Sequence, residues 1–251
     1  MFLLEKTYDI DEIVRNNLHT HTFFSRCAKP EMTLRAMITA AEQAGLHTLA
    51  VTDHSDVEDN INTFMNTVLL RTLRSQIDTP VRVLIGAELS AYGVGKYSET
   101  EETCRALEFR SYALNHYHLD YWEQPDERSA EGYARHMLAV LDALFDTDRA
   151  DCIAHPFSPG KMDFFNDDEK RAVLAAISDN ALGDILEKGE RAGCMWELHA
   201  PSFLAYPAFA RRMFYLGKEV GVHFSFGTDA HSLAAISTAG YAEQMKSILK
   251  G

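Results

Sequence analysis

Residues 48–54 read TLAVTDH, a short apolar run that ends in an aspartate and a histidine. A run of this length, bounded by polar residues, predicts a buried strand over 48–52. Residues 81–89, VRVLIGAEL, repeat the pattern and carry Glu88 near the end of a second predicted strand. A carboxylate at the end of so apolar a strand is costly to bury without a partner. Both runs therefore predict strands that deliver polar side chains at their carboxyl ends.

Amphipathic helices are predicted between these strands and along the rest of the chain. Gly45 is placed to end the first helix, and Pro80 to end the second. Residues 92–102 and 122–129 are expected to be loops. The apolar positions of the first helix are Leu34, Met37, Ile38 and Ala41. The later helices are expected over 60–77, around Met137, Val140, Leu141 and Leu144, and over 167–186, 206–220 and 239–249. Alternation of strands and helices predicts parallel strands joined by crossover helices.

Seven strands are predicted, and each has a potential metal ligand at or just past its carboxyl end. They are expected to end near His21, His54, Glu88, His118, His155, His199 and Asp229. With 251 residues, 46% of them apolar, the chain can form one large domain over residues 1–251. We therefore expect an α/β fold, a barrel of seven rather than eight parallel strands, closed or nearly so, with its site at the carboxyl ends of the strands.

Composition limits the classes of partner. A formal net charge of −13 makes nucleic acid an unfavourable partner, because its phosphate backbone repels an acidic surface. The four cysteines form no C-x-x-C pair, which is typical of reduced thiols in a cytosolic protein. We find no signal peptide and no run approaching the roughly 18 apolar residues of a membrane span. A cytoplasmic location is expected.

Histidines supply the strongest signal for chemistry. Eight of the 11 lie at predicted strand ends: His19, His21, His54, His116, His118, His155, His199 and His231. The other three, His47, His136 and His223, are expected to be structural or surface residues. Each motif alone is a weak signal for a metal site. Asp53 could equally bind metal or orient a histidine. Several strand ends that converge on one point are what a multinuclear metal site requires.

The ordered series H-x-H, T-D-H, G-x-E, a strand-end histidine, A-H-P and T-D-A-H resembles the PHP family of polymerase and histidinol-phosphatase domains. The likeness runs from His19 to His231. It implies a distorted, TIM-like (β/α)7 barrel with up to three metal ions. By this resemblance the first ion is bound by His19, His21, Glu88 and Asp229. The second is bound by Glu88, His118 and His155, with Glu88 bridging, and His54 and His231 contribute to the third. We choose His118 over His116 for the second ion, and His116 is then expected to contact substrate.

Two departures from the family pattern affect the third ion and the substrate. Cys27 stands where some members have a histidine, and a thiolate is a good zinc ligand. Arg26 beside it is a candidate for binding phosphate. His199 stands where the family often has asparagine, and it is a candidate for binding substrate. Lys161 and Arg191 are further candidate cations on position alone.

These residues predict a metal-dependent phosphoesterase that hydrolyses a small phosphomonoester with a metal-bridging hydroxide. We expect two or three divalent ions of zinc, manganese or iron, and His54, Asp229 and His231 as catalytic residues. Histidinol-phosphate phosphatase is the closest alternative, and nucleotide or phosphotyrosine phosphatases are others. A nucleic-acid exonuclease and a non-catalytic, metal-binding regulatory domain are alternatives of other classes. Metal identity, oligomeric state and substrate stay open.

Overall fold

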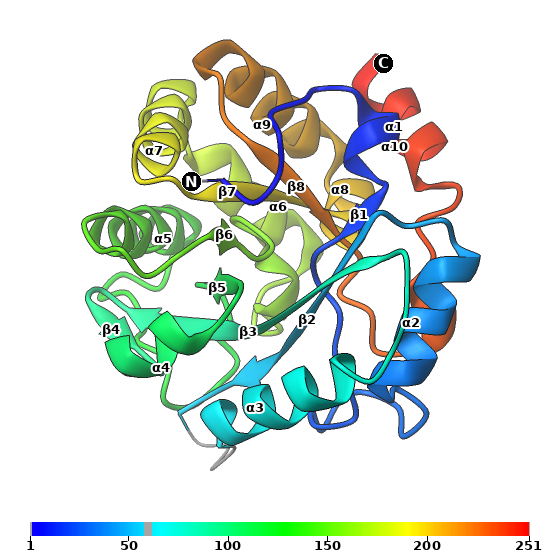
Figure 1. Cartoon of the computed structure of the whole chain (residues 1–251). Coiled ribbons are helices and arrows are strands. Elements are labelled where there is room, and N and C mark those ends of the chain that lie inside the picture. The colour runs from blue at the N-terminus through cyan, green and yellow to red at the C-terminus, as the bar shows by residue number, and fades with distance from the viewer. Residues whose placement is uncertain (1, 58–61, 251) are drawn as a thin grey trace.

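The computed structural model describes residues 2–57 and 62–250, and its centre is a nearly closed barrel of seven parallel strands (Figure 1). The order around the barrel is β1-β2-β3-β5-β6-β7-β8. The predicted (β/α)7 architecture is confirmed. The strands are β1 (Asn16–Asn17), β2 (Thr48–Ser55), β3 (Arg82–Gly93), β5 (Arg110–Ala113), β6 (Cys152–Ile153), β7 (Met195–His199) and β8 (Phe224–Gly227), and the short β4 (Lys96–Tyr97) pairs with β3 alone.

Helices surround the barrel, as Figure 1 shows. They are α1 (Ile10–Ile13), α2 (Leu34–Gln43), α3 (Thr63–Arg74), α4 (Glu101–Ala106), α5 (Ala130–Phe145), α6 (Asp167–Ala176), α7 (Asp179–Arg191), α8 (Ala200–Ala205), α9 (Pro207–Val220) and α10 (Tyr241–Lys250), with 3-10 turns η1 (Pro159–Lys161) and η2 (Leu233–Ala235). In the part of the chain that the structure describes, no helix is both long and apolar enough to cross a membrane.

The first and last strands meet and bring the barrel close to closure. The backbone N–H of Leu18 donates to the carbonyl of Phe226 at 2.8 Å, and Thr20 forms a parallel bridge with Ala230. The residues that follow β1 and those that follow β8 are thereby held side by side. Potential ligands from the two ends of the chain consequently reach the same place.

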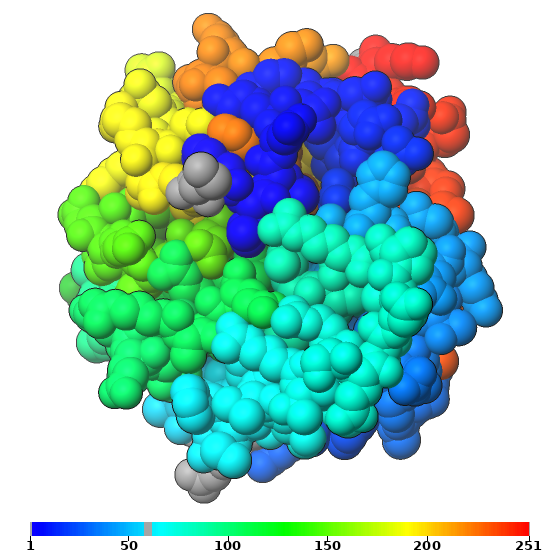
Figure 2. Space-filling model, in the orientation of Figure 1, coloured from blue at the N-terminus to red at the C-terminus, as the bar shows by residue number. Residues whose placement is uncertain are grey.

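Side-chain alternation divides the barrel interior into layers. In β2, Ala50 joins an apolar cluster inside the barrel, whereas Leu49 and Val51 pack outwards against the cluster of α2. Successive strand residues face opposite sides, so His54 lies on the side of Ala50. Phe2, Leu3 and Leu4 pack against the inner apolar cluster. This N-terminal segment lies over the face seen in Figure 2, which leaves the opposite end of the barrel for the polar layer.

Several sequence-based boundaries were wrong. The helix expected over 167–186 is two helices, α6 and α7, because Ile177 is extended and the Ser178 side chain caps α7 by accepting from the N–H of Ala181. The loop expected over 92–102 contains β4 and the start of α4, and α8 was not predicted. The helix expected over 60–77 is α3, capped by Asn62, and its expected start at residue 60 lies outside the described residues.

A partly buried ion pair outside the barrel provides a prediction about pH. Arg74 donates two hydrogen bonds to Glu108, and the N–H of Ile85 donates a third at 2.8 Å. Burial opposes ionisation of Glu108, but these bonds outweigh it and lower the pKa of Glu108 below 4.5. A carboxyl whose pKa is depressed by folding stabilises the fold above its unfolded pKa, and the stabilisation is lost as the pH falls through the folded pKa.

We therefore expect Glu108→Gln to lower the free energy of unfolding by about 1 kcal/mol at pH 7, a value discounted for solvent exposure. The difference from the unmodified protein should shrink steadily below pH 4.5. Urea denaturation at pH 7, 5 and 3.5 measures it. A difference that stays constant across this range would show that the charge of Glu108 contributes nothing.

Candidate metal centre

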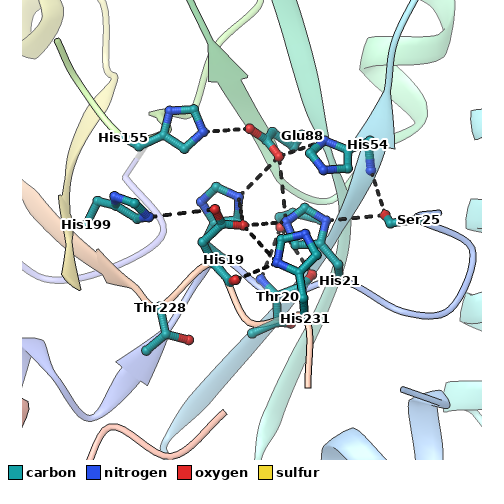
Figure 3. A network of polar contacts seen from close by, with 12 residues as sticks. His19, Thr20, His21, Ser25, His54, Glu88, His155, His199, Thr228 and His231 are labelled. Atoms are coloured by element: carbon teal, nitrogen blue, oxygen red, sulfur yellow. Dashed lines mark hydrogen bonds and ion pairs between the residues drawn. The ribbon is translucent and has the colours of Figure 1, made fainter. Parts of the chain in front are cut away.

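The carboxyl ends of the strands bring the predicted ligands into one group (Figure 3). Within the parallel ladder, His54 of β2 is in register with Glu88 of β3, so the two side chains are neighbours. His19 and His21 follow β1, and the other members of the group come from the ends of β6, β7 and β8. These other members are His155, His199, Asp229 and His231.

Glu88 lies at the centre of the group and is 2% exposed. Its Oε1 is 2.8 Å from His155 Nε2, and its Oε2 is 3.0 Å from His54 Nδ1 and 3.3 Å from His19 Nε2. Burial works against ionisation, but the imidazoles of His54 and His19 outweigh it and hold the pKa of Glu88 well below its usual range. One ionised carboxylate therefore faces ring nitrogens from three strand ends.

Asp229 is a second carboxylate beside Glu88. Its Oδ1 is 2.9 Å from His21 Nε2 and 3.5 Å from His19 Nε2. Burial again opposes ionisation, and the neighbouring His19 and the hydrogen-bonded imidazoles lower the pKa of Asp229 well below its usual value. Asp229 has φ 54° and His155 has φ 73°, both in the left-handed region. Such backbone strain concentrates at functional sites, at a cost of about 1–3 kcal/mol per residue.

Three groups of side chains have ligand atoms close enough to share an ion, with all atoms of a group within 4.8 Å of one another. They are His19, His21, Glu88 and Asp229; Glu88, His116 and His155; and His21, His54 and His231. Glu88 belongs to two groups, as a bridging carboxylate would.

His116, and not His118, is the residue that joins Glu88 and His155. His116 is buried, with Nε2 at 3.8 Å from Glu88 Oε1, whereas His118 is exposed at the cavity mouth. The extended strand expected through His118 ends at Ala113, and a turn at residues 117–118 directs the two histidines differently. We therefore propose His116 in place of His118 as the ligand.

The residues around Glu88 fit divalent cations. Three buried polar atoms at their centre have no hydrogen-bond partner: His19 Nε2, His54 Nδ1 and Glu88 Oε2. Burial, helped by the neighbouring His54, lowers the pKa of His21 to about 3, and burial lowers the pKa of His116 well below its usual value. Metal ions bind neutral imidazoles and ionised carboxylates. Burial lowers the pKa of His19 and of His54, but the neighbouring carboxylates outweigh it and raise both well above the usual value, so an ion that binds these two histidines would displace their protons.

Two supporting residues, Glu197 and Asp53, were missed or left undecided by the sequence. Glu197 accepts a hydrogen bond from His19 Nδ1 at 2.9 Å, which directs the other ring nitrogen of His19 towards Glu88. Asp53, for which two roles were open, accepts from the backbone and hydroxyl of Thr22 and from the hydroxyl of Ser25. Asp53 thereby anchors the loop after β1. The signals for Glu197 were its place in an apolar strand and the family's E-x-N pattern, which reads Glu197-Leu198-His199 here.

The predicted substrate residues line an open cavity of about 470 Å³. Arg26 and Lys161 are at its wall together with His118 and Cys27. Burial opposes ionisation of Cys27, but hydrogen bonds with His231 and His54 lower the pKa of the Cys27 thiol to about 6.

Two other candidates belong to none of the three groups. His199 has Nδ1 at 2.7 Å from Ser202 Oγ and Nε2 at 3.8 Å from Asp229 Oδ2, so it borders the first group. Arg191 ends α7, which leads into the start of β7, and it pairs with Glu187. It is therefore at the opposite end of the strands, and its expected role in phosphate binding was wrong.

Asn115 holds the strained loop that carries His155. Its Nδ2 donates to the carbonyls of His155 at 3.0 Å and Ser158 at 2.8 Å, and the side chain is buried. In Asn115→Asp a carboxylate would face both carbonyl oxygens. We expect the free energy of unfolding to fall by about 2–4 kcal/mol, since two hydrogen bonds are lost and a buried charge is added.

Urea denaturation and zinc titration of Asn115→Asp measure this effect, with weaker binding of one ion expected. The matched control is Asn180→Asp in the first turn of α7, where the side chain is exposed and a negative charge is favourable. If Asn115→Asp denatures and binds zinc like the control, Asn115 does not position His155.

Comparisons with known proteins agree with this geometry. A search of curated proteins found no match. A histidinol phosphate phosphatase of Lactococcus lactis, solved with zinc, L-histidinol and phosphate, is similar in fold with a TM-score of 0.60 and 17% identity, over 94% of this chain and 92% of that one. A protein of Listeria monocytogenes described as a histidinol phosphatase has a TM-score of 0.62 and 13% identity, over 91% of this chain and 99% of that one.

A comparison with family models shows to which protein family the chain belongs. The model of the PHP domain matches residues 17–181, and the barrel described above continues beyond that match through β7 and β8. Its span contains the H-x-H, T-D-H, G-x-E and A-H-P motifs, whose histidines and glutamate meet at the centre of the site. The chain belongs to the PHP domain family.

Proposed function

We propose that this protein is a metal-dependent phosphoesterase that hydrolyses a small phosphomonoester. The observation that carries the proposal is the position of Glu88, whose two oxygens face imidazoles from separate strand ends within one buried group. A carboxylate shared between two groups of ligands is typical of centres that hold two ions. Membership of the PHP family supports the same reaction class.

Some side chains of the site would bind metal ions, and others would bind the substrate. Bound zinc, manganese or iron would polarise phosphoryl oxygens and lower the pKa of a water molecule. The first two groups of ligands, which share Glu88, would hold two ions, and the group of His21, His54 and His231 a third. Arg26 and Lys161 at the cavity wall would attract and orient the phosphate dianion. His54, Asp229 and His231 stay our proposed catalytic residues, since they border the same cavity.

Space beside the phosphate position would accommodate the leaving group. A second cavity of about 370 Å³ shares His116, His155, Lys161 and Asp229 with the first. Ser202 and Tyr206 line its far side. A phosphomonoester with its phosphate between the ligands and its alcohol in this second cavity fits both volumes.

Hydrolysis of p-nitrophenyl phosphate tests the proposal directly. The purified protein is assayed with added manganese, zinc or iron and after chelation, and bound metal is counted by elemental analysis. We expect metal-dependent release of nitrophenol with two or three ions per chain. Bound metal without turnover of any phosphoester would favour the regulatory alternative, and a protein that binds no metal would contradict the proposal.

Histidinol phosphate is the first specific substrate that we propose to test, because the two similar structures described above are histidinol phosphatases by name. A kcat/KM for histidinol phosphate well above that for p-nitrophenyl phosphate would support this assignment. Preference for single-stranded DNA would favour the exonuclease alternative, which the net charge of −13 opposes. A cytoplasmic location also stays a prediction from the sequence.

A further inference from the structure

His136 on α5 belongs to a chain of hydrogen bonds outside the metal centre. Its Nδ1 is 2.7 Å from the Tyr117 hydroxyl, and its Nε2 is 3.2 Å from Glu123 Oε1. The His136 side chain is only 9% exposed, so both contacts are largely shielded from water. The sequence predicts no more than a structural or surface role for His136. This chain of hydrogen bonds, however, ends at Tyr117, the residue directly after the proposed ligand His116.

The charge of Glu123 fixes the direction of these hydrogen bonds. Lys96 of β4 forms an ion pair with Glu123, and its hydrogen bond, helped by that of His136, holds the pKa of the Glu123 carboxyl below its usual value. An ionised carboxylate only accepts hydrogen bonds, so His136 Nε2 carries a proton and donates to Glu123. In the neutral imidazole Nδ1 is then the acceptor, and the Tyr117 hydroxyl donates to it.

A second chain of hydrogen bonds holds the backbone of Tyr117 to the same helix. The Tyr133 hydroxyl donates to the Gln124 side chain at 2.8 Å, and Gln124 Nε2 donates to the carbonyl of Tyr117 at 3.1 Å. Tyr133 and His136 are three residues apart and lie on one face of α5. Tyr117 is 3% exposed, and its ring packs edge-on against that of Tyr133. The helix α5 therefore fixes both the side chain and the backbone of Tyr117.

The direction of His116 depends on this anchor, because His116 lies beyond the sheet. The strand β5 ends before it, and residues 114–116 belong to no helix or strand. His116 is nonetheless buried, and the ring of Trp122 packs against it with centroids 5.4 Å apart. A movement of Tyr117 would carry the backbone of His116 with it. The 3.8 Å separation between His116 Nε2 and Glu88 Oε1 would then change.

We propose that His136 is a positioning residue for the metal centre and acts on His116 through Tyr117. It keeps His116 directed towards Glu88 and His155, with which His116 forms one group of ligands. Replacement of a hydrogen-bonded residue behind a metal ligand typically weakens metal binding by about 10- to 100-fold. The inference rests on the proposed metal centre, with His116 as a ligand, but not on the proposed substrate. It gives a histidine of an outer helix an effect on one bound ion.

Tyr117→Phe tests this inference, because it removes the hydroxyl that binds His136 and keeps a ring of nearly the same size. Calorimetric titration of the metal-free protein with zinc measures each dissociation constant, and His116→Ala identifies the ion concerned. We expect that ion to bind about 10-fold more weakly in Tyr117→Phe and the others to bind as before. The matched control is Tyr97→Phe, which loses a hydrogen bond from its hydroxyl to the carbonyl of Ala143 and should bind every ion like the unmodified protein.

Variants of His136 separate positioning from stability. His136→Phe should weaken the same ion, and the double variant with Tyr117→Phe should bind it no more weakly than the weaker single variant, since both lose one shared hydrogen bond. His136→Asn places an amide oxygen near the position of Nδ1 and should restore most of the affinity.

Urea denaturation of the same variants reports their stability. Variants of Tyr117 and His136 that lose stability but bind every ion like Tyr97→Phe would overturn the inference, and so would a lack of rescue in His136→Asn. An unmodified protein that binds no metal would contradict the proposed function as well. Normal metal binding without hydrolysis of p-nitrophenyl phosphate would reject the proposed reaction alone.

Discussion

Glu88→Gln is expected to lower kcat/KM for p-nitrophenyl phosphate by at least about 1,000-fold. A lost electrostatic contact to the transition state costs 100- to 1,000-fold in comparable sites, and here two groups of ligands lose one member together. The amide is nearly isosteric with the carboxylate, so the barrel should remain folded. Elemental analysis should find fewer bound ions, which separates loss of metal from loss of fold.

Glu108→Gln is the matched control for this prediction, because it removes the charge of another glutamate bound to β3 but outside the barrel. We expect its kcat/KM and metal content to equal those of the unmodified protein. Circular dichroism of both variants reports the fold. Full activity in Glu88→Gln would rule out the central role assigned to this carboxylate.

Gly227→Ala is expected to damage both the fold and the site. A Cβ at this position would lie 1.9 Å from Glu197 Oε1 and 2.5 Å from His19 Cβ, distances that no packed structure tolerates. Glu197 is buried, so neither neighbour can turn away into solvent. We expect the free energy of unfolding to fall by about 1–3 kcal/mol, the usual range for overpacking. Displacement of His19 should also lower kcat/KM by about 100-fold.

The same substitution at Gly183 provides a control within the chain. A Cβ there meets no atom within 4 Å, and Gly183 lies inside α7. Gly183→Ala should therefore raise the free energy of unfolding by about 0.5–1 kcal/mol and leave activity unchanged. Thermal denaturation and steady-state kinetics of the pair measure both effects. Equal stability and activity of the two variants would show that the neighbours of Gly227 can move aside without a loss of stability.

The barrel and most of the ligand positions could be predicted because both depend on periodic features. Apolar runs of strand length gave the order of the elements, and parallel strands end on one side of a barrel. The histidines at those ends then had to meet. What the sequence did not specify was where a strand stops, and β5 stops at Ala113, five residues before the expected end at His118. The choice between His116 and His118 depended on that boundary.

The residues that position the ligands were harder to predict. Asn115 and Glu197 act through hydrogen bonds to a backbone carbonyl and to a ring nitrogen, and these contacts join segments about 40 and 178 residues apart. No spacing of residues within a short stretch of sequence predicts such a contact. Polar residues in buried strands are the available signal, since a buried polar group needs a partner, but the partner becomes known only from the fold.

The pairing of His54 with Glu88 has a consequence for how the chain reaches its native state. A slip of one residue between β2 and β3 would turn one of these side chains to the outside of the barrel. Of the alternative alignments, only the native one assembles the complete coordination sphere. Ions that bind there would lower the free energy of this alignment and of no other. The centre that we propose for catalysis would thus also favour the native register of β2 and β3 while the sheet forms.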